Sequence, residues 1–251
     1  MREVEIVERR FFMDNNNING DSCIIDGEEF NHIVNVLRLK AGETVILCTG
    51  DGNDRKAEII EIGKRQLLCK IHEAVKNLNE AKIEVTLYMA LVKGEKMELI
   101  AQKITELGAA ELTPLYTRFT TVKPETARLN RLEKISLEAA KQCGRAKTLK
   151  INPVYGINEA AADFKSGKFD FVLFPYENEK ERGLKAALKK MGKAKKIAVV
   201  IGSEGGFSQE EAEALEAAGA VPCSLGPRIL RAETAAITAV AAVMLETGEL
   251  S

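Results

Sequence analysis

Two glycine-bearing segments carry the residues best suited to hold a small ligand. Residues 202–208 read Gly-Ser-Glu-Gly-Gly-Phe-Ser, and residues 225–231 read Leu-Gly-Pro-Arg-Ile-Leu-Arg. Each follows a short apolar run typical of a strand, where glycine lets a ligand approach the backbone closely. Glycines that only form tight strand-to-helix turns are a weaker explanation for two such loops than for one. The absence of a phosphate-loop lysine favours a ligand without phosphate.

Cationic residues form two clusters that could contact an anionic polymer. Residues 125–150 contain seven Lys or Arg and three acids, although a solvated helix face is the usual explanation of such a run. Arg9 and Arg10 precede Phe11 and Phe12, a pairing suited to phosphates and unstacked bases. The same residues fit a strand end with core phenylalanines, and Arg10 fits a salt bridge within its own domain. The net charge of -1 excludes a polycationic protein that coats nucleic acid, but it does not exclude local basic patches.

The histidines and cysteines argue against several enzyme classes. His32 and His72 are the only histidines, so a Ser-His-Asp or Cys-His centre cannot form within residues 83–251. The five cysteines are dispersed, which predicts reduced thiols in a cytoplasmic protein and no bound metal. The sequence lacks the nucleotide-binding motifs of kinases and dinucleotide-dependent dehydrogenases. Because residues 1–5 lack an apolar core and no apolar run is long enough for a membrane, we expect neither a signal peptide nor a membrane-spanning helix.

The elements that must position these residues fall into two groups, the first of which is β-rich. Residues 1–72 predict a small mostly-β domain, a barrel, with one helix at about residues 28–39. Turn residues at 49–54 should close a hairpin. The polar stretch 73–82 is predicted to be a linker. The expected strands are Val4–Val7, Ser22–Ile25, Thr44–Cys48, Lys56–Ile62 and Gln66–Ile71.

Residues 83–251 alternate between strand-like and helical patterns. Six of each predict an α/β domain whose mostly parallel sheet is covered on both faces. The expected strands are Ile83–Leu91, Glu111–Tyr116, Ile151–Tyr155, Phe169–Phe174, Lys196–Ile201 and Val221–Leu225.

Three of the helices have clear boundaries or faces. One should run from about Met97 to Leu107 and end at Gly108. Another should begin with the capping box at residues 208–211 and end at Gly219. The last, at about residues 231–246, is more apolar than one sheet face requires, so we expect it to pack partly against a second subunit.

Serial motifs along the chain resemble those of RsmE-type methyltransferases. They occur in order at residues 9–12, 32–38, 93–98, 102–108 and 138–145 and in both glycine segments, the second continuing to residue 235. The resemblance extends from about residue 9 to residue 245. Ser203 stands where the family commonly has proline, which would restrict the loop. Cys143 stands where serine is common.

The resemblance implies a fold, a reaction and partners. The fold would be a PUA-like RNA-binding β-barrel at residues 1–72 and a SPOUT-class domain with a C-terminal trefoil knot at residues 83–251. The reaction would transfer a methyl group from S-adenosylmethionine to N3 of a uridine in 16S rRNA of the small ribosomal subunit. A homodimer is implied as well, with an active site completed by both subunits. Nothing in the hydrophobic periodicity indicates the knot.

Site residues carried over from the resemblance fall into three groups. The cofactor-binding residues would be Pro175, Tyr176, Glu177, Ile201, Gly202, Ser203, Glu204, Gly205, Gly206, Leu225, Gly226, Ile229, Leu230, Thr234 and Ala235. The RNA-binding residues would be Arg9, Arg10, Arg38, Lys93, Lys96, Gln142 and Arg145. The catalytic candidates are Arg10, Arg145, Glu204 and Arg231.

The chemistry of uridine N3 sets what these residues must do. N3 carries a proton and must lose it to become a nucleophile, and cations or N–H donors would stabilise the charge that spreads to the uracil oxygens. Glu204 is one candidate for the base and could instead orient the loop. Two other functions stay open, namely a non-catalytic RNA-binding ribosome assembly factor and methylation at C5 with Cys143 as the covalent nucleophile.

Overall fold

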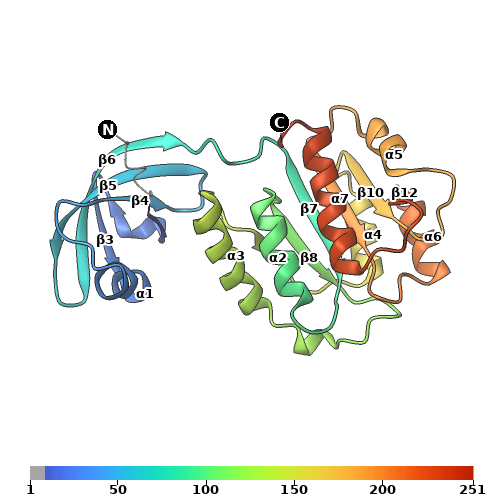
Figure 1. Ribbon diagram of the computed structural model, residues 1–251, viewed down its shortest axis with the longest axis horizontal. Coiled ribbons are helices and arrows are strands. Elements are labelled where there is room, and N and C mark those ends of the chain that lie inside the picture. The colour runs from blue at the N-terminus through green and yellow to red at the C-terminus, as the bar shows by residue number, and fades with distance from the viewer. Residues whose placement is uncertain (1–8, 251) are drawn as a thin grey trace. The chain divides into compact units, whose positions relative to one another are not determined.

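The computed structural model describes residues 9–250, which divide into two compact units (Figure 1). The first contains the described residues up to Glu80 together with Ala140–Thr148, and the second contains Ala81–Ala139 and Leu149 onward. The first division falls at the end of the stretch predicted as a linker. The inclusion of residues 140–148 in the first unit was not anticipated. The predicted strand Val4–Val7 lies outside the described residues.

A curled six-stranded sheet forms the first unit, in the order β1-β4-β5-β6-β3-β2. β1 is parallel to β4, and the other neighbouring strands are antiparallel. Two irregularities in the β5–β6 register bend the sheet. The mostly-β domain predicted from the sequence is confirmed. Its strands are β1 (Arg10–Phe12), β2 (Ile18–Asn19), β3 (Ser22–Asp26), β4 (Thr44–Cys48), β5 (Asn53–Ile62) and β6 (Gln66–Lys76), with a short 3-10 turn, η1 (Asn15–Asn17).

Two elements of this unit differ from their predictions. In place of one helix at 28–39, α1 (Gly27–Asn31) passes into a π-helical turn, η2 (His32–Val36), and Arg38 has a φ of 55°. Arg38 ends the helical segment, and the Leu39 N–H then donates to the Ile33 carbonyl at 3.0 Å, with both Ile33 and Leu39 buried in the core. β6 extends to Lys76, into the predicted linker, because it pairs with β5 as far as Asn53.

An ion pair with little solvent exposure joins the sheet to residues 140–148. The Arg10 guanidinium donates to both Asp54 oxygens, at 2.5 and 2.9 Å, and the two side chains are 7% and 13% exposed. Asn77 Nδ2 donates to both Asp54 oxygens and to the Gly144 carbonyl, at 2.9, 2.9 and 3.0 Å. The Arg10 side chain is therefore engaged inside its own unit, as in the salt-bridge alternative considered from the sequence.

A second ion pair holds the same segment. Arg145, 4% exposed, pairs with Glu80 at 3.0 Å. The other Glu80 oxygen accepts the backbone N–H groups of Ala146 and Lys147, both at 2.8 Å. Residues 140–148 thus belong to the first unit because its carboxylates and amides satisfy their polar groups.

The second unit contains a six-stranded sheet in which all pairings are parallel, in the order β12-β10-β11-β7-β8-β9. In β11, Ile197 and Val199 face one core and Ala198 and Val200 face the other. Helices therefore cover both faces, as predicted for this α/β unit. The strands are β7 (Glu84–Ala90), β8 (Glu111–Leu115), β9 (Lys150–Ile151), β10 (Phe171–Pro175), β11 (Lys196–Ile201) and β12 (Val221–Cys223).

Helices α2, α3, α5 and α7 contribute to the core on one face, and α4 and α6 to the core on the other (Figure 1). The Ser208 capping box begins α6, and Gly108 and Gly219 follow α2 and α6 with positive φ, as predicted. The helices are α2 (Lys96–Glu106), α3 (Leu129–Cys143), α4 (Ile157–Lys165), α5 (Leu184–Met191), α6 (Gln209–Ala217) and α7 (Ala232–Glu246), with a 3-10 turn, η3 (Pro124–Thr126).

The Arg10–Asp54 pair makes a prediction about stability. We expect Asp54→Ala to lower the free energy of unfolding by about 3 kcal/mol, because it leaves the Arg10 charge buried without its carboxylate. Asp51→Ala is the matched control, since Asp51 pairs with Arg55 on the surface of the same hairpin, and such pairs contribute about 1 kcal/mol or less. Urea denaturation of both variants measures the difference. Equal losses would show that the Arg10–Asp54 pair does not stabilise the unit.

Candidate active site

The loops that carry the predicted ligand-binding residues all leave the sheet at one edge. β7, β8, β10, β11 and β12 are parallel, so their carboxyl ends lie together. This is the edge at which open α/β sheets bind ligands. The loop after β11 contains residues 202–208, and the loop after β12 contains residues 224–231.

The loop after β11 is packed too closely to hold side chains at two of its glycines. A Cβ at Gly202 would lie 3.0 Å from the Phe207 ring and 3.1 Å from the backbone of Gly206. A Cβ at Gly205 would lie 2.8 Å from the Cβ of Phe119, in the segment after β8. Glycine is therefore required for the loops after β8 and β11 to touch.

Gly206 is the most constrained of the three glycines. Its φ is 68°, and a Cβ there would collide with the carboxylate of Glu177, in the loop after β10. Its N–H donates to the Ser203 carbonyl at 3.0 Å. This turn holds Ser203 and Gly206 close together. The Glu177 carboxylate lies directly against the backbone of Gly206.

An aromatic stack fixes the base of these loops. Phe207 packs edge-on against Phe174, with ring centroids 5.3 Å apart, and Phe174 stacks on Tyr176 at 5.2 Å with 13° between the rings. Phe174 and Phe207 are buried, whereas Tyr176 is half-buried. The end of β10 and the loop after β11 are thus held together below the glycines.

Two buried polar atoms at this edge lack hydrogen-bond partners. Ser203 is 7% exposed and its Oγ makes no hydrogen bond. Glu233 Oε2, in the first turn of α7, accepts none either, although Lys96 Nζ lies 3.8 Å away. Buried polar groups in folded proteins are nearly always satisfied, so each of these atoms suits a ligand group that completes its hydrogen bonding.

Lys96 links three elements at this edge electrostatically. From the start of α2, its Nζ lies 2.7 Å from Glu204 Oε1 and 3.8 Å from Glu233 Oε2. Partial burial tends to raise the pKa of Glu204, but the hydrogen bond from Lys96 outweighs it and holds this pKa below its usual value. Glu204 is therefore a carboxylate at neutral pH and a weak base, which suits an anchor of the loop better than a proton acceptor.

The loops after β10 and β12 are paired with each other. Ser224 N–H donates to the Arg182 carbonyl at 2.8 Å, and Leu184 N–H donates to the Ser224 carbonyl at 3.0 Å. Gly226 follows with a φ of 109°. Beyond it, Ile229 is 94% exposed, an unusual state for an apolar side chain in a loop otherwise tied to the sheet.

The structure brings most of the predicted site residues to this edge of the second unit. The predicted cofactor-binding residues, with Lys93, Lys96 and Arg231, lie in its loops, at the ends of β10 and β11, or in the first turns of α2 and α7. The remaining predicted residues belong to the first unit. Among them Arg9, Arg38 and Gln142 are exposed, whereas Arg10 and Arg145 form the ion pairs described above.

Two residues at this edge were missed by sequence reasoning. Phe119 contacts Gly205 and is still 44% exposed, and Glu233 has an unsatisfied buried oxygen. Phe119 follows a strand in the same way as the glycine segments, so the same strand-end rule could have identified it. Glu233 gives no such signal, because a glutamate in a helical first turn is ordinarily a capping residue.

Within residues 9–250, no group of three His, Cys, Asp or Glu side chains is arranged to hold a metal ion. No helix in the same range has both the length and the apolar character needed to cross a membrane.

Comparisons with known proteins identify the family. Residues 79–244 match the RNA methyltransferase domain, and residues 25–71 match the RNA methyltransferase PUA domain. The chain is 34% identical over 231 residues to ribosomal RNA small subunit methyltransferase E of Bacillus subtilis, covering 89% of this chain and 90% of that protein. The corresponding protein of Rickettsia conorii is 33% identical over 215 residues, covering 85% of each.

A solved structure agrees with these matches. The ribosomal RNA small subunit methyltransferase E from Neisseria gonorrhoeae, bound to S-adenosyl methionine, superposes with a TM-score of 0.83 and 27% identity, covering 95% of this chain and 97% of that one. The resemblance seen in the sequence motifs is thereby confirmed. The chain belongs to the ribosomal RNA small subunit methyltransferase E family.

Proposed function

We propose that this chain transfers the methyl group of S-adenosylmethionine to N3 of a uridine in 16S rRNA of the small ribosomal subunit. The observation that carries the proposal is the loop after β11, where three glycines leave no room for side chains beside a buried, unsatisfied Ser203 hydroxyl. The loop lies at the sheet edge where such folds bind ligands. Mass spectrometry of rRNA from a deletion strain, before and after addition of the purified protein, tests it.

The residues at this edge fit S-adenosylmethionine. Its adenosine and methionine parts carry hydrogen-bonding groups but no phosphate, which matches an edge that has two unsatisfied polar side-chain atoms and no phosphate-loop lysine. Ser203 Oγ would donate to one of these groups. When bound, the cofactor supplies a methyl group that is already activated, so no metal is required. The residues that would hold it are Pro175, Tyr176, Glu177, Ile201 to Gly206, Leu225, Gly226, Ile229, Leu230, Thr234 and Ala235.

Arg231 and Lys93 are the cations that we assign to the uracil. Both side chains are exposed, and neither forms an ion pair within residues 9–250. Their charges would stabilise the negative charge that develops on the uracil oxygens as N3 loses its proton. Glu204 would hold Lys96 and the loop in place, because its lowered pKa makes it a weak base. The proton then leaves to a group outside this set or to water.

In the first unit, we assign RNA contacts to the exposed Arg9, Arg38 and Gln142. Arg38 is exposed and has a left-handed backbone conformation, two residues after the π-helical turn. Arg10 and Arg145 would act on RNA only through the segment 140–148 that they help to fix.

The proposal includes finer features of the family. A trefoil knot of the SPOUT class is part of the proposal, and its support is the family to which the chain belongs. A homodimer is supported by α7, whose Leu245 is 63% exposed at the end of an apolar helix. A ribosomal substrate would place the protein in the cytoplasm.

The two alternative functions can be separated from this one. Methylation at C5 would need Cys143 as a covalent nucleophile, and Cys143 belongs to the first unit while the glycine loops belong to the second. Full activity of Cys143→Ser would exclude it. A non-catalytic assembly factor would bind RNA without transferring a methyl group to it.

Gly206→Ala should weaken cofactor binding at least tenfold, because its Cβ displaces the Glu177 carboxylate from the loop. Gly219→Ala is the matched control, since Gly219 also has a positive φ but has open space around it. Both variants should lose about 1 kcal/mol of stability from backbone strain. Calorimetric titration with S-adenosylmethionine measures the affinity, and equal affinities in the two variants would contradict the placement of the cofactor.

Ser203→Ala should lower cofactor affinity several-fold, by about 1 kcal/mol, because one hydrogen bond is lost. The melting temperature of the protein without cofactor should stay the same or rise, since a buried, unsatisfied hydroxyl is removed. Calorimetry and thermal denaturation of the same variant test both parts. A fall in melting temperature with unchanged affinity would mean that the hydroxyl serves the fold alone.

Lys96→Met should shift the acid limb of the methyl-transfer rate to higher pH. With Lys96 present, the lowered pKa of Glu204 keeps its carboxylate ionised below the usual range, and the ion pair is lost only as pH falls through that lowered value. Without the Lys96 ammonium group the pKa of Glu204 rises, so its carboxylate becomes protonated at a higher pH. Lys103→Met, which removes an ion pair with Glu106 on the same helix, should leave the profile unchanged. Superimposable profiles for all three proteins would exclude a role for the pair.

A further inference from the structure

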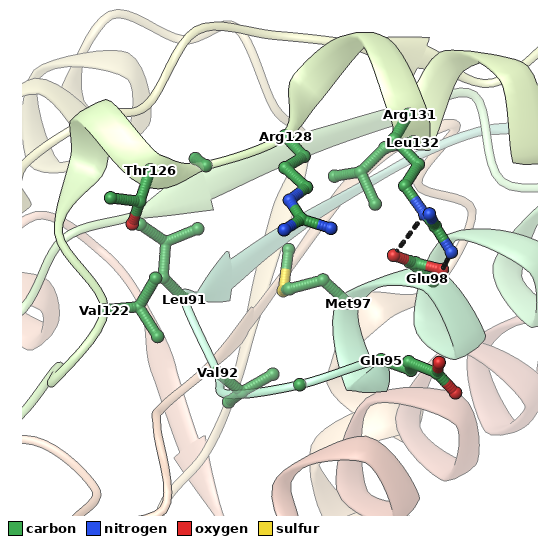
Figure 2. A pocket seen from close by; sticks show the side chains of 12 residues that line it. Leu91, Val92, Glu95, Met97, Glu98, Val122, Thr126, Arg128, Arg131 and Leu132 are labelled. Atoms are coloured by element: carbon green, nitrogen blue, oxygen red, sulfur yellow. Dashed lines mark hydrogen bonds and ion pairs between the residues drawn. The ribbon is translucent and has the colours of Figure 1, made fainter.

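A pocket of about 450 Å³ lies beside the glycine loop but contains none of its residues. It is lined by residues that follow β7, by the first turns of α2 and α3, and by residues between 122 and 128 (Figure 2). Lys96, which binds Glu204 in the glycine loop, stands between two of its lining residues in the chain. The pocket therefore adjoins the proposed methyl-donor site and is distinct from it.

The floor of the pocket is apolar. Leu91, Val92, Met97 and Leu132 are each less than 8% exposed, and Val122 adds a further apolar side chain. Figure 2 shows the Met97 thioether facing the pocket interior. A floor of aliphatic groups and a polarizable sulfur suits the face of a planar ring.

One of the two arginines at the rim is neutralised. Arg131 Nε lies 2.5 Å from Glu98 Oε1, and its second nitrogen donates to Glu98 Oε2 at 2.7 Å. The two contacts neutralise both charges, because each carboxylate oxygen of Glu98 is paired with a guanidinium nitrogen of Arg131. The pair fixes the wall of the pocket and adds little net charge to it.

Arg128 is the other arginine, and its charge is not neutralised. It is exposed, and within residues 9–250 its side chain forms no ion pair. Figure 2 shows its guanidinium above Met97 and directed into the pocket, whereas the Glu95 carboxylate points away. The pocket thus combines an apolar floor with a free guanidinium, which is the chemistry of a planar apolar group that carries an anion.

We propose that this pocket binds a nucleotide of the substrate RNA that flanks the methylated uridine, with its base on Met97 and Leu132 and its phosphate on Arg128. The volume lies within the range of small-ligand sites and accommodates one nucleotide. A guanidinium matches phosphate geometry through two parallel hydrogen bonds. We place this nucleotide beside the methylated uridine because the pocket includes no residue of the glycine loops, which would hold the methyl donor. The inference rests on the proposed function in taking RNA as the substrate.

Arg128→Ala is the test, with Lys123→Ala as a control that removes one exposed positive charge from the same segment without touching the pocket. Unmethylated small ribosomal subunits from a deletion strain serve as the probe, in co-sedimentation and in methyl-transfer assays. We expect Arg128→Ala to weaken subunit binding and raise KM about tenfold to a hundredfold, the loss of a charge-assisted hydrogen bond. It should also reduce the salt dependence of binding by about one phosphate contact. Lys123→Ala should match the wild-type protein.

A second variant, Thr126→Trp, narrows the pocket from an exposed position on its rim. It should weaken subunit binding without changing the affinity for S-adenosylmethionine measured by calorimetry. Unchanged subunit binding in both variants would overturn the inference while leaving the proposed function intact. A changed oligomeric state with unchanged subunit binding would also overturn it, because a second copy of the chain would then occupy the pocket. If the wild-type protein bound subunits through Arg128 yet transferred no methyl group, the proposed reaction would fail and the RNA pocket would stand.

Discussion

The close contact of three loops around Gly202, Gly205 and Gly206 is the constraint on which the site depends. Phe119, Glu177 and Phe207 come from the loops after β8, β10 and β11, and each occupies the space that a glycine side chain would take. The parallel sheet brings these loops to one edge, but only residues without a Cβ let them touch there. The same contact lies beside the buried Ser203 hydroxyl, which has no hydrogen-bond partner, so the packed loop retains a polar group that a ligand can satisfy.

Electrostatics at this edge is organised around Lys96. One ammonium group lies between Glu204 and Glu233, so the glycine loop and the start of α7 are tied to the start of α2. Because this pairing lowers the pKa of Glu204, the carboxylate cannot be a strong proton acceptor near neutral pH. The chain is therefore better equipped to stabilise a uracil that has lost its proton than to remove the proton with a dedicated base.

Sequence reasoning succeeded where the signal is local. β11 has the predicted bounds because a short apolar run rich in β-branched residues, bounded by a lysine and a glycine, favours a buried strand. The Ser208 capping box is likewise contained in four adjacent residues. Sequence reasoning did not identify partners that are distant in the chain: a salt bridge was one interpretation of Arg10, without its carboxylate, and none was considered for Arg145. Asp54 is 44 residues from Arg10, and Glu80 is 65 from Arg145, so no pattern near either arginine indicates a buried ion pair. The π-helical turn at His32–Val36 likewise has no local pattern in the sequence that indicates it.

The arginines illustrate why a family motif alone does not assign a ligand contact. Arg10 and Arg145 lie within such motifs, yet their side chains are 7% and 4% exposed and face carboxylates of their own unit. Breaking either pair to reach RNA would leave a buried carboxylate without its partner, which would destabilise the fold. Arg128 lies in the basic run 125–150 and in no family motif, and its guanidinium is directed into a pocket where Glu98 is paired with Arg131 and Glu95 points away. Within residues 9–250, Arg128 is thus an arginine whose charge is not paired, and it is available to a phosphate. Arg10 and Arg145 are more recognisable in the sequence, but their charges are already paired.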